Sequence, residues 1–449
     1  MAATTFNDTT ADHKWSTAAN WSDGVPDSSD AVTVNSTVTS LIIDTTAEAL
    51  SADFTGTTNP ITVSGSGNIS LYGNLKLSSS LTGAAGVVWT HTGNVSILAA
   101  SDITTAGVSL ETSANWTVNT IGTVKIATDA SSTTSDNLKI GGKFTLTKGT
   151  LNLNVRSLFC NDFVSTGTET RVLQGSSAAG IILTGLSGTL LDFSTTTNLT
   201  VQYAPNIHIG SGGRTLSGNV TIKGGGKTFG NLVIRRHAGN YSSIIEGSNT
   251  WANILIETPN STYQYNKVAF EAGTTQTLTS LTSFGHTLYK NYIQSTSAGT
   301  AATLTDTSGI NAVINNVVQD ITVNGGATWG AGGATNTNTS GNTGWTWTTS
   351  SYYVSPDGND STGDGSEGTP WLTISKVQSA ALPGDTVYFA SQGTWEGSNP
   401  ILVPTPGVTY DGSTYGTGTR AKLLLNGYTD VYHGVVDISY PYVTLRGIE

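Results

Sequence analysis

The stretch "GNISLYGNLKL" (Gly67–Leu77) holds the pattern that decides the fold. Twice within it, Gly-Asn is followed by an apolar residue, one further residue and a second apolar residue. Side chains of a β-strand alternate between two faces, so each copy predicts a short strand with one buried face. Gly and Asn both tolerate the left-handed backbone region, which suits the turn before each strand.

The same pattern recurs along the chain. Its asparagines are Asn68, Asn74, Asn94, Asn137, Asn198, Asn219, Asn231 and Asn253. Three gaps are 20, 21 and 22 residues and two more, of 43 and 61, are near multiples, whereas gaps of 6 and 12 do not fit. A coil of roughly 20 residues cannot bury its own apolar face, but stacked coils can. Asn side chains at equivalent corners are then expected to hydrogen-bond along the stack.

The composition agrees with an all-β chain. Only 11% of the residues are charged, against about 25% in ordinary globular proteins, and the residues that favour exposed helices are scarce. We therefore predict an elongated right-handed parallel β-helix, or solenoid. A string of antiparallel β-sandwiches is the alternative, but its hairpins favour Asn-Gly, whereas Gly-Asn prevails here.

Charge and hydropathy limit the partners. The chain has 449 residues and a net charge of −11, and its 19 Lys and Arg residues are scattered. Without a basic stripe we expect no nucleic-acid partner. No apolar run approaches the roughly 20 residues that a membrane-spanning helix needs, so no membrane span is expected.

The first two predicted segments resemble known surface proteins. Residues 1–50 contain "KWSTAANWSDGVPDSSD", which is similar to the opening of many β-helical surface proteins, autotransporter passengers included. The matching residues are Trp15, Asn20, Trp21, Gly24, Pro26 and Asp30. This resemblance implies a capping or attachment segment. Residues 51–349, with stretches such as "LKIGGKFTLTKGTLNLN", resemble rungs of phage and bacterial surface structural proteins, which implies an irregular parallel β-helix.

The third segment, residues 350–449, contains "YYVSPDGNDSTGDGSEGTPWLTI" followed by "PGDTVYF". From residue 352 it strongly resembles the opening of pectate-lyase-like right-handed β-helix domains. The resemblance implies a second β-helix with a short capping helix. Ile374, Val377 and Ala381 lie at helical spacing and agree with that helix. The first full rungs of such domains begin about where the chain ends, so we expect this domain to be truncated.

Four carboxylates in this segment are a candidate metal site. Asp357, Asp360, Asp364 and Glu367 fall within eleven residues, and such oxygen ligands suit Ca²⁺. Their spacing does not match an EF-hand loop, and we favour a turn cluster with solvated charges. No other cofactor is expected. In the pectate-lyase-like family the calcium and the Lys or Arg base lie on later rungs, which this sequence lacks. We therefore predict no catalytic residue and no enzyme activity, with any continuation beyond Glu449 left open.

Five aromatic residues flank the start of the third segment. They are Trp329, Trp345, Trp347, Tyr352 and Tyr353. Such rings could stack on sugars, or they could plug the end of one β-helix against the start of the next. Because large aromatic side chains bury about 150–250 Å² each, we favour the plug.

The resulting functional hypothesis is a structural and adhesive component of a phage virion, such as a tail fibre, spike or appendage. We expect copies of the chain to associate, with a homotrimer as one form, and to contact other virion or surface structural proteins. A host-surface glycan or protein would be the receptor. Two alternatives are an adhesin or filament subunit on a bacterial cell surface, and a polysaccharide lyase or hydrolase with catalysis after residue 352.

Overall fold

The computed structural model describes residues 3–77, 87–106, 108–112, 115–127, 137–210, 216–235, 241–259, 266–333, 335–397, 402–425, 436–438 and 442–449. The described chain is nearly all β, and its parallel strands stack into a β-solenoid of about 15 turns. The parallel solenoid predicted from the repeats is therefore confirmed. The chain divides into two compact units, one of residues 1–255 and 267–277, the other of residues 256–266 and 278–449.

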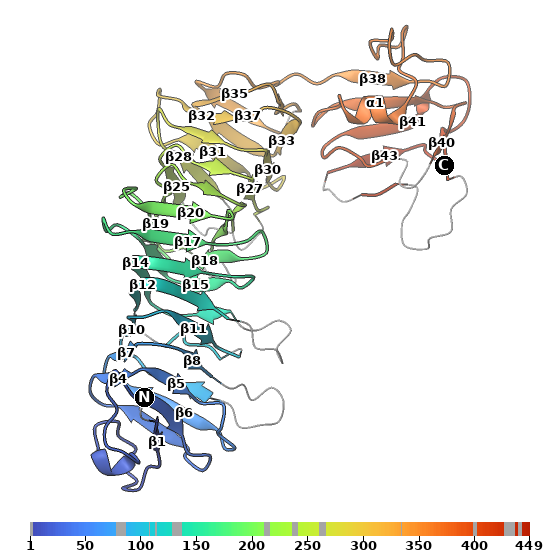
Figure 1. The fold of residues 1–449 in the computed structure, drawn as a ribbon. Helices are drawn as coiled ribbons and strands as arrows, with labels where there is room; N and C mark the ends of the chain where they lie inside the picture. The colour runs from blue at the N-terminus through green and yellow to red at the C-terminus, as the bar shows by residue number, and fades with distance from the viewer. Residues whose placement is uncertain are drawn as a thin grey trace. The chain divides into compact units, whose positions relative to one another are not determined.

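In the first unit, successive strands alternate among three faces of each turn (Figure 1). The first face holds β1 (Ala3–Phe6), β2 (Ala31–Val34), β5 (Ser51–Asp53), β8 (Leu75–Lys76), β11 (Ser101–Thr104), β17 (Arg171–Gln174) and β20 (Leu199–Gln202), and the short strands β23 (Thr228–Phe229), β26 (Thr250–Trp251) and β29 (Thr275–Thr277) follow.

The second face holds β3 (Ser40–Ile43), β6 (Ile61–Gly65), β9 (Val87–Trp89), β13 (Leu138–Lys139), β15 (Leu158–Cys160), β18 (Gly180–Leu183), β21 (Asn206–Ile209), β24 (Leu232–Ile234) and β27 (Asn253–Ile256). The third holds β4 (Ala47–Ala49), β7 (Ile69–Leu71), β10 (Val95–Ile97), β16 (Asp162–Val164), β19 (Gly188–Asp192), β22 (Val220–Lys223), β25 (Ser242–Glu246) and β28 (Lys267–Phe270).

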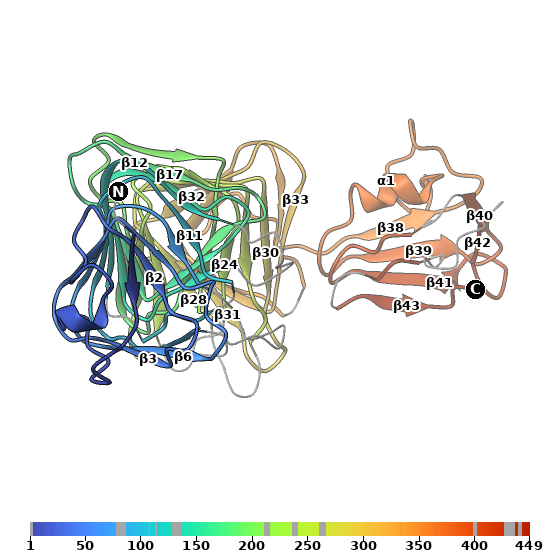
Figure 2. The same ribbon diagram turned by 60° about the horizontal axis from the view of Figure 1, so that its bottom comes forward.

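Two long strands, β12 (Trp116–Ile126) and β14 (Lys143–Asn152), pass around a corner and serve both the third and the first face. In Figure 2, β12 and β17 lie on the opposite side of the turns from β3 and β6.

An aromatic ladder runs through the interior of the first unit. Phe163 lies between Phe144 and Phe193, with ring centroids 5.3 Å from each. Phe229 then stacks on Trp251 at 4.9 Å, and Phe193 joins the two groups with a centroid distance of 6.2 Å to Phe229. All five side chains are fully buried. Neighbouring turns thus hold one another through ring contacts as well as backbone hydrogen bonds.

The predicted asparagine ladders are present at the corners. Asn115 donates from Nδ2 to Asn94 Oδ1 at 3.1 Å, and Asn94 donates to Asn68 Oδ1 at 3.3 Å. A second ladder joins Asn253 to Asn231 at 2.6 Å. Each contact satisfies side-chain polar atoms within the stack.

The turns of the solenoid are unequal in length. Hydrogen bonds between neighbouring turns join residues 19, 21, 26 or 28 positions apart, so the coil length varies around and above the roughly 20 residues read from the repeats. The gaps of 6 and 12 also have a cause. Asn68 precedes β7 on the third face, but Asn74 precedes β8 on the first face. The pattern therefore marks the start of a strand on any face, not one corner of each coil.

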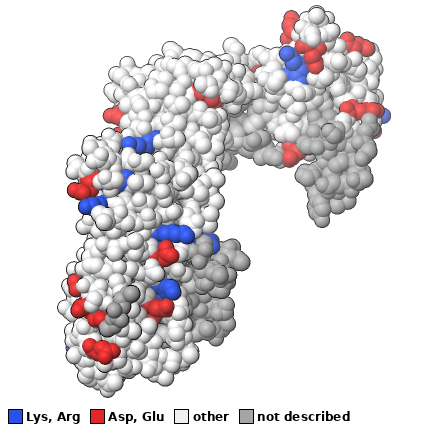
Figure 3. Space-filling model, viewed as in Figure 1, with Lys and Arg blue, Asp and Glu red and all other residues white. Residues whose placement is uncertain are grey.

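Outward charges also connect neighbouring turns. Lys76 lies 3.7 Å from Asp53, Lys143 lies 3.8 Å from Asp162, and Lys223 lies 3.4 Å from Glu246. Opposite charges that face each other across strands stabilise that register modestly. Figure 3 shows charged residues scattered over a surface that is mostly uncharged on the visible face.

The first turn brings Trp15 and Trp21, which carry the resemblance of residues 1–50, into one aromatic cluster. The Trp21 ring packs on Phe6 and Trp15 with centroid distances of 4.9 and 4.7 Å. Asn20 is fully buried and donates to Asp12 Oδ1 at 2.7 Å, which fixes the loop between β1 and β2. Residues 1–50 nevertheless form turns of the solenoid, because β1 pairs with β2 and β2 with β5.

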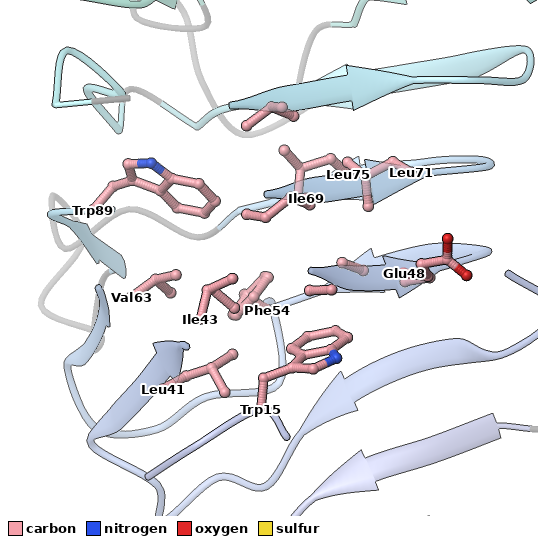
Figure 4. A pocket seen from close by; sticks show the side chains of 14 residues that line it. Trp15, Leu41, Ile43, Glu48, Phe54, Val63, Ile69, Leu71, Leu75 and Trp89 are labelled. Atoms are coloured by element: carbon pink, nitrogen blue, oxygen red, sulfur yellow. The ribbon is translucent and has the colours of Figure 1, made fainter. Parts of the chain in front are cut away.

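A cavity of about 30 Å³ lies inside the first turns, among apolar side chains that include Trp15, Ile43, Phe54 and Trp89 (Figure 4). Glu48 also borders it, but its carboxylate points away from the other labelled side chains. A hole of this size among apolar side chains offers no hydrogen-bonding partners and is a packing defect, not a ligand site.

The second unit begins with further solenoid turns. Their strands are β30 (Ser280–Phe284), β31 (Asn291–Ser295), β32 (Ala302–Thr305), β33 (Ile310–Ile314), β34 (Asn316–Gln319), β35 (Ile321–Asn324), β36 (Thr328–Gly330) and β37 (Thr337–Ser340). Pairing is again parallel, as between β31 and β34.

Residues 350–449 form a module with a hydrophobic cluster of its own. Its elements are β38 (Ser351–Val354), α1 (Ile374–Gln378), β39 (Thr386–Ala390), β40 (Thr394–Gly397), β41 (Thr409–Tyr415), β42 (Lys422–Leu425) and β43 (Thr444–Arg446). The predicted short helix is present as α1. Thr373 is the N-cap residue of α1, and its side chain accepts a hydrogen bond from Lys376 N. Within the helix, Ile374 and Val377 are buried.

Candidate functional site

The loop between β38 and α1 is built around Trp371. Trp371 is buried and donates from Nε1 to Gly363 O at 3.0 Å. Gly365 has a φ of +79°, and a Cβ atom there would lie 2.8 Å from the Trp371 ring. A Cβ atom at Gly358 would clash with the backbone carbonyl oxygen of Trp371. The glycines of this loop thus allow the chain to wrap tightly around one indole.

Two of the four candidate metal ligands are used to fold this loop. Asp360 accepts hydrogen bonds from Leu372 N at 2.8 Å and from Thr373 Oγ1 at 2.6 Å. Partial burial favours the neutral acid, but the hydrogen bonds from Thr373 and Leu372 outweigh it and lower the pKa of Asp360. Asp364 accepts from Thr369 Oγ1 and Ser366 N, and these bonds lower its pKa to about 2.

Asp357 and Glu367 are exposed and lie near tyrosines of the module. Burial and then the charges of Glu367 and Asp357 raise the pKa of Tyr415. Within the described ranges, no three His, Cys, Asp or Glu side chains are grouped so that they could hold a metal ion. The hydrogen bonds of Asp360 and Asp364 support the folding role of the loop, and the calcium interpretation stays a prediction.

The three candidate tryptophans lie in the last solenoid turns of the second unit. The Trp345 ring lies 5.6 Å from that of Trp329 and 6.1 Å from that of Trp347. Trp329 and Trp345 are only 2% and 8% exposed, and each indole N–H donates to a backbone carbonyl. Buried rings of this kind suit the predicted plug and offer little surface for stacking on a sugar.

The two candidate tyrosines of β38 point in opposite directions. Tyr352 packs against the hydrophobic cluster and stacks on Trp371 at 4.9 Å. Tyr353 lies on the outer face of the sheet and stacks on Tyr388 of β39 at 5.0 Å. The Tyr415 ring meets Tyr353 edge-on at 4.9 Å. The structure therefore separates the predicted aromatic set into a tryptophan cluster, a core tyrosine and a surface tyrosine.

The outer face of the β38–β39–β41–β43 sheet, which we call the tyrosine face, has two rows in register. One row is Tyr353, Tyr388, Asp411 and Arg446, and the other is Ser351, Thr386, Thr409 and Thr444. Of these eight residues, only Tyr353 was a candidate in the sequence analysis. The others are identified by the strand register, which depends on the lengths of the connecting loops and is not encoded in any local motif.

Asp411 lies next to Tyr388 in the first row and makes hydrogen bonds and an ion pair there. Its carboxylate accepts from Ser413 N and Ser413 Oγ, each at 2.8 Å, and from Thr414 Oγ1 at 2.7 Å. Partial burial opposes ionisation, but these hydrogen bonds and Arg446 lower the pKa of Asp411. Arg446 Nε lies 3.8 Å from Asp411, and 61% of the arginine side chain stays exposed.

A buried carboxylate fixes the start of the module. Asp385 accepts from Ser350 N at 2.6 Å and from Leu382 N at 2.7 Å. Burial raises its pKa although both hydrogen bonds act in the other direction. Asp385 is therefore a positioning group for the chain before β38.

Comparing the chain with known proteins finds no relative. No family model matches the chain, and no curated protein or solved structure matches it either. In the part of the chain that the structure describes, no helix has the length and hydropathy to cross a membrane.

Proposed function

We propose that the chain is a structural and adhesive component of a phage virion, in which a solenoid carries a binding surface. The observation that supports this most is the ladder system of the first unit. Aromatic, asparagine and ion-pair contacts join successive turns there in addition to the strand pairing. Such redundant contacts between neighbours suit a stiff support.

The surface chemistry supports the same proposal. Charged residues on the visible face are few and separated, and only 11% of the residues of the chain are charged. Receptor binding would then depend on particular side chains and not on a general electrostatic field. Copies of the chain would associate within the appendage, with a trimer as one form.

Fractionation of a culture that produces the protein tests the location. Particles are separated from membranes and soluble protein on a density gradient, and the chain is quantified by mass spectrometry. We expect it to sediment with particles that contain capsid protein. Enrichment in the membrane fraction would instead support the cell-surface adhesin, and recovery only as free soluble protein would contradict both.

A second assay tests the expectation that the chain is not an enzyme. The protein is incubated with polygalacturonate and alginate, and unsaturated products are followed by ultraviolet absorbance. We expect no product. Product formation that scales with protein concentration would establish the lyase alternative.

A further inference from the structure

We propose that the tyrosine face binds a neutral oligosaccharide, with its sugar rings on Tyr353 and Tyr388 and its hydroxyl groups on the adjacent Ser/Thr row. The inference rests on the adhesive function proposed above and assigns the binding surface and the ligand class. It places the site on the outer face of the sheet, on side chains that do not belong to the tryptophan cluster.

The two tyrosine rings form a fixed apolar surface. Tyr353 and Tyr388 stack at 5.0 Å with an angle of 22° between their planes, and both are half-buried. Tyr415 closes one side of Tyr353 through its edge-on contact. The C–H side of a sugar ring packs well on such a face, and tyrosine offers both contact area and a hydroxyl. Because the two rings already hold each other in place, binding would cost little side-chain conformational entropy.

Hydrogen-bonding groups lie beside the rings at matching spacing. Ser351, Thr386, Thr409 and Thr444 are in register on neighbouring strands, two residues before the members of the tyrosine row. Residues two apart on a strand share a face, and neighbouring strands are about 4.8 Å apart. Each hydroxyl can donate and accept. A chain of sugars lying across the strands would therefore meet rings on one edge and hydroxyls on the other.

Arg446 adds a directional contact at the far end of the row. Its guanidinium is planar and carries donors in a fixed geometry, which suits a pair of neighbouring hydroxyls. Asp411 places a carboxylate 3.8 Å from Arg446 Nε, which offsets part of its positive charge. Arg446 would thus donate hydrogen bonds to hydroxyl groups of the sugar without making the surface selective for anions.

The charges nearby favour a neutral ligand over an acidic one. Glu367 and Asp357 lie on the tyrosine side, where burial and then the Glu367 charge raise the pKa of Tyr353. A polyanionic glycan on these rings would meet like charges. Neutral hexose polymers carry the hydroxyl groups that the surface can bind and avoid that repulsion.

Affinity electrophoresis tests the proposal with the full chain. Native gels contain dextran, galactomannan or mixed-linkage β-glucan as neutral probes, and alginate or polygalacturonate as acidic ones. We expect at least one neutral polysaccharide to retard the protein. Tyr353→Ala and Tyr388→Ala should each weaken that binding about ten-fold, whereas Tyr388→Phe should largely retain it because the ring remains.

Matched variants keep the test decisive. Tyr203→Asn removes a tyrosine that is 72% exposed in the first unit, where φ is +58°, and should leave binding unchanged. Arg446→Ala changes an exposed residue of the tyrosine face and should also weaken binding, so the proposal stays testable if either tyrosine-to-alanine variant misfolds. Three outcomes would overturn the assignment: retardation by the acidic probes only, no retardation by any neutral probe, or equal retardation of the parent protein and the Tyr353→Ala and Tyr388→Ala variants. A protein partner would give no retardation by any of the polysaccharides, and particle fractionation would still report on the virion proposal.

Discussion

The aromatic ladder of the first unit and the tyrosine row of the module use the same contact in opposite settings. Phe229 and Trp251 stack in register on neighbouring turns inside the solenoid, where both rings are fully buried. Tyr353 and Tyr388 stack in register on neighbouring strands as well, but on the outer face of their sheet. Register brings aromatic rings of neighbouring parallel strands into contact, and burial decides whether that contact stabilises the fold or presents a surface.

The largest expected difference between the two regions is in stability. Phe163→Ala should lower the free energy of unfolding of the first unit by about 3–5 kcal/mol, because it removes a buried ring and leaves a cavity. Tyr353→Ala should cost only about 1 kcal/mol. Chemical denaturation followed by circular dichroism measures both. Equal losses would show that the surface rings also carry the fold.

The loop around Trp371 allows a sharper test with two neighbouring glycines. Gly365→Ala should destabilise the module by about 1–3 kcal/mol, since it strains the backbone and brings a methyl group against the indole. Gly368→Ala is the control, because nothing lies within 4 Å of its Cβ position. The melting temperatures of the two variants should differ clearly. If they match, the loop does not depend on its wrap around Trp371.

The asparagine ladder should contribute less than the rings. Asn94→Ala removes the contacts to Asn68 and Asn115, and we expect a loss of about 1 kcal/mol because these groups are partly exposed to water. Ser96→Ala is the control, because Ser96 is the outward-facing residue of β10, two positions after Asn94. A larger loss than for Phe163→Ala would mean that corners, and not the interior, hold the turns together.

A pH dependence follows from Asp364. Its folded pKa of about 2 lies below the ordinary value of 3.8, so the folded loop favours the ionised form. The stabilisation is present above the ordinary value and is lost as the pH falls from 3.8 towards 2. Asp364→Asn keeps an acceptor and should make the melting temperature less dependent on pH in this window. An unchanged acid slope would contradict the role assigned to Asp364.

Calcium is expected to have the smallest effect. Because Asp360 and Asp364 are hydrogen-bonded within the loop, millimolar Ca²⁺ should leave the melting temperature unchanged. A rise that disappears in Asp357→Ala would instead support a metal site at Asp357, Asp360, Asp364 and Glu367. Mg²⁺ at equal concentration controls for ionic strength.

Local patterns predicted the strands but not their partners. Gly-Asn before an alternating apolar pair located β7, β8 and β10, because turn chemistry and side-chain alternation are local properties. Buried Asn291 and Asn316 escaped the same pattern, because Gln294 and Gln319 stand where the pattern needs its second apolar residue.

The candidate site shows the same limit at longer range. Tyr353 was predicted as an aromatic of interest, but Tyr388, Asp411 and Arg446 join it only through strand register. That register depends on the lengths of the connecting loops, which local periodicity does not encode.

The unequal turns have a consequence for changes in chain length. Because successive turns differ in residue number but keep their strands in register, corners can accept inserted residues at a modest entropic cost. The corner at Gly273, where no atom lies within 4 Å of the Cβ position, is suited to an inserted peptide. One extra residue within β16 would instead exchange the inward and outward side chains beyond it. The solenoid could therefore serve as a scaffold on which foreign loops are displayed.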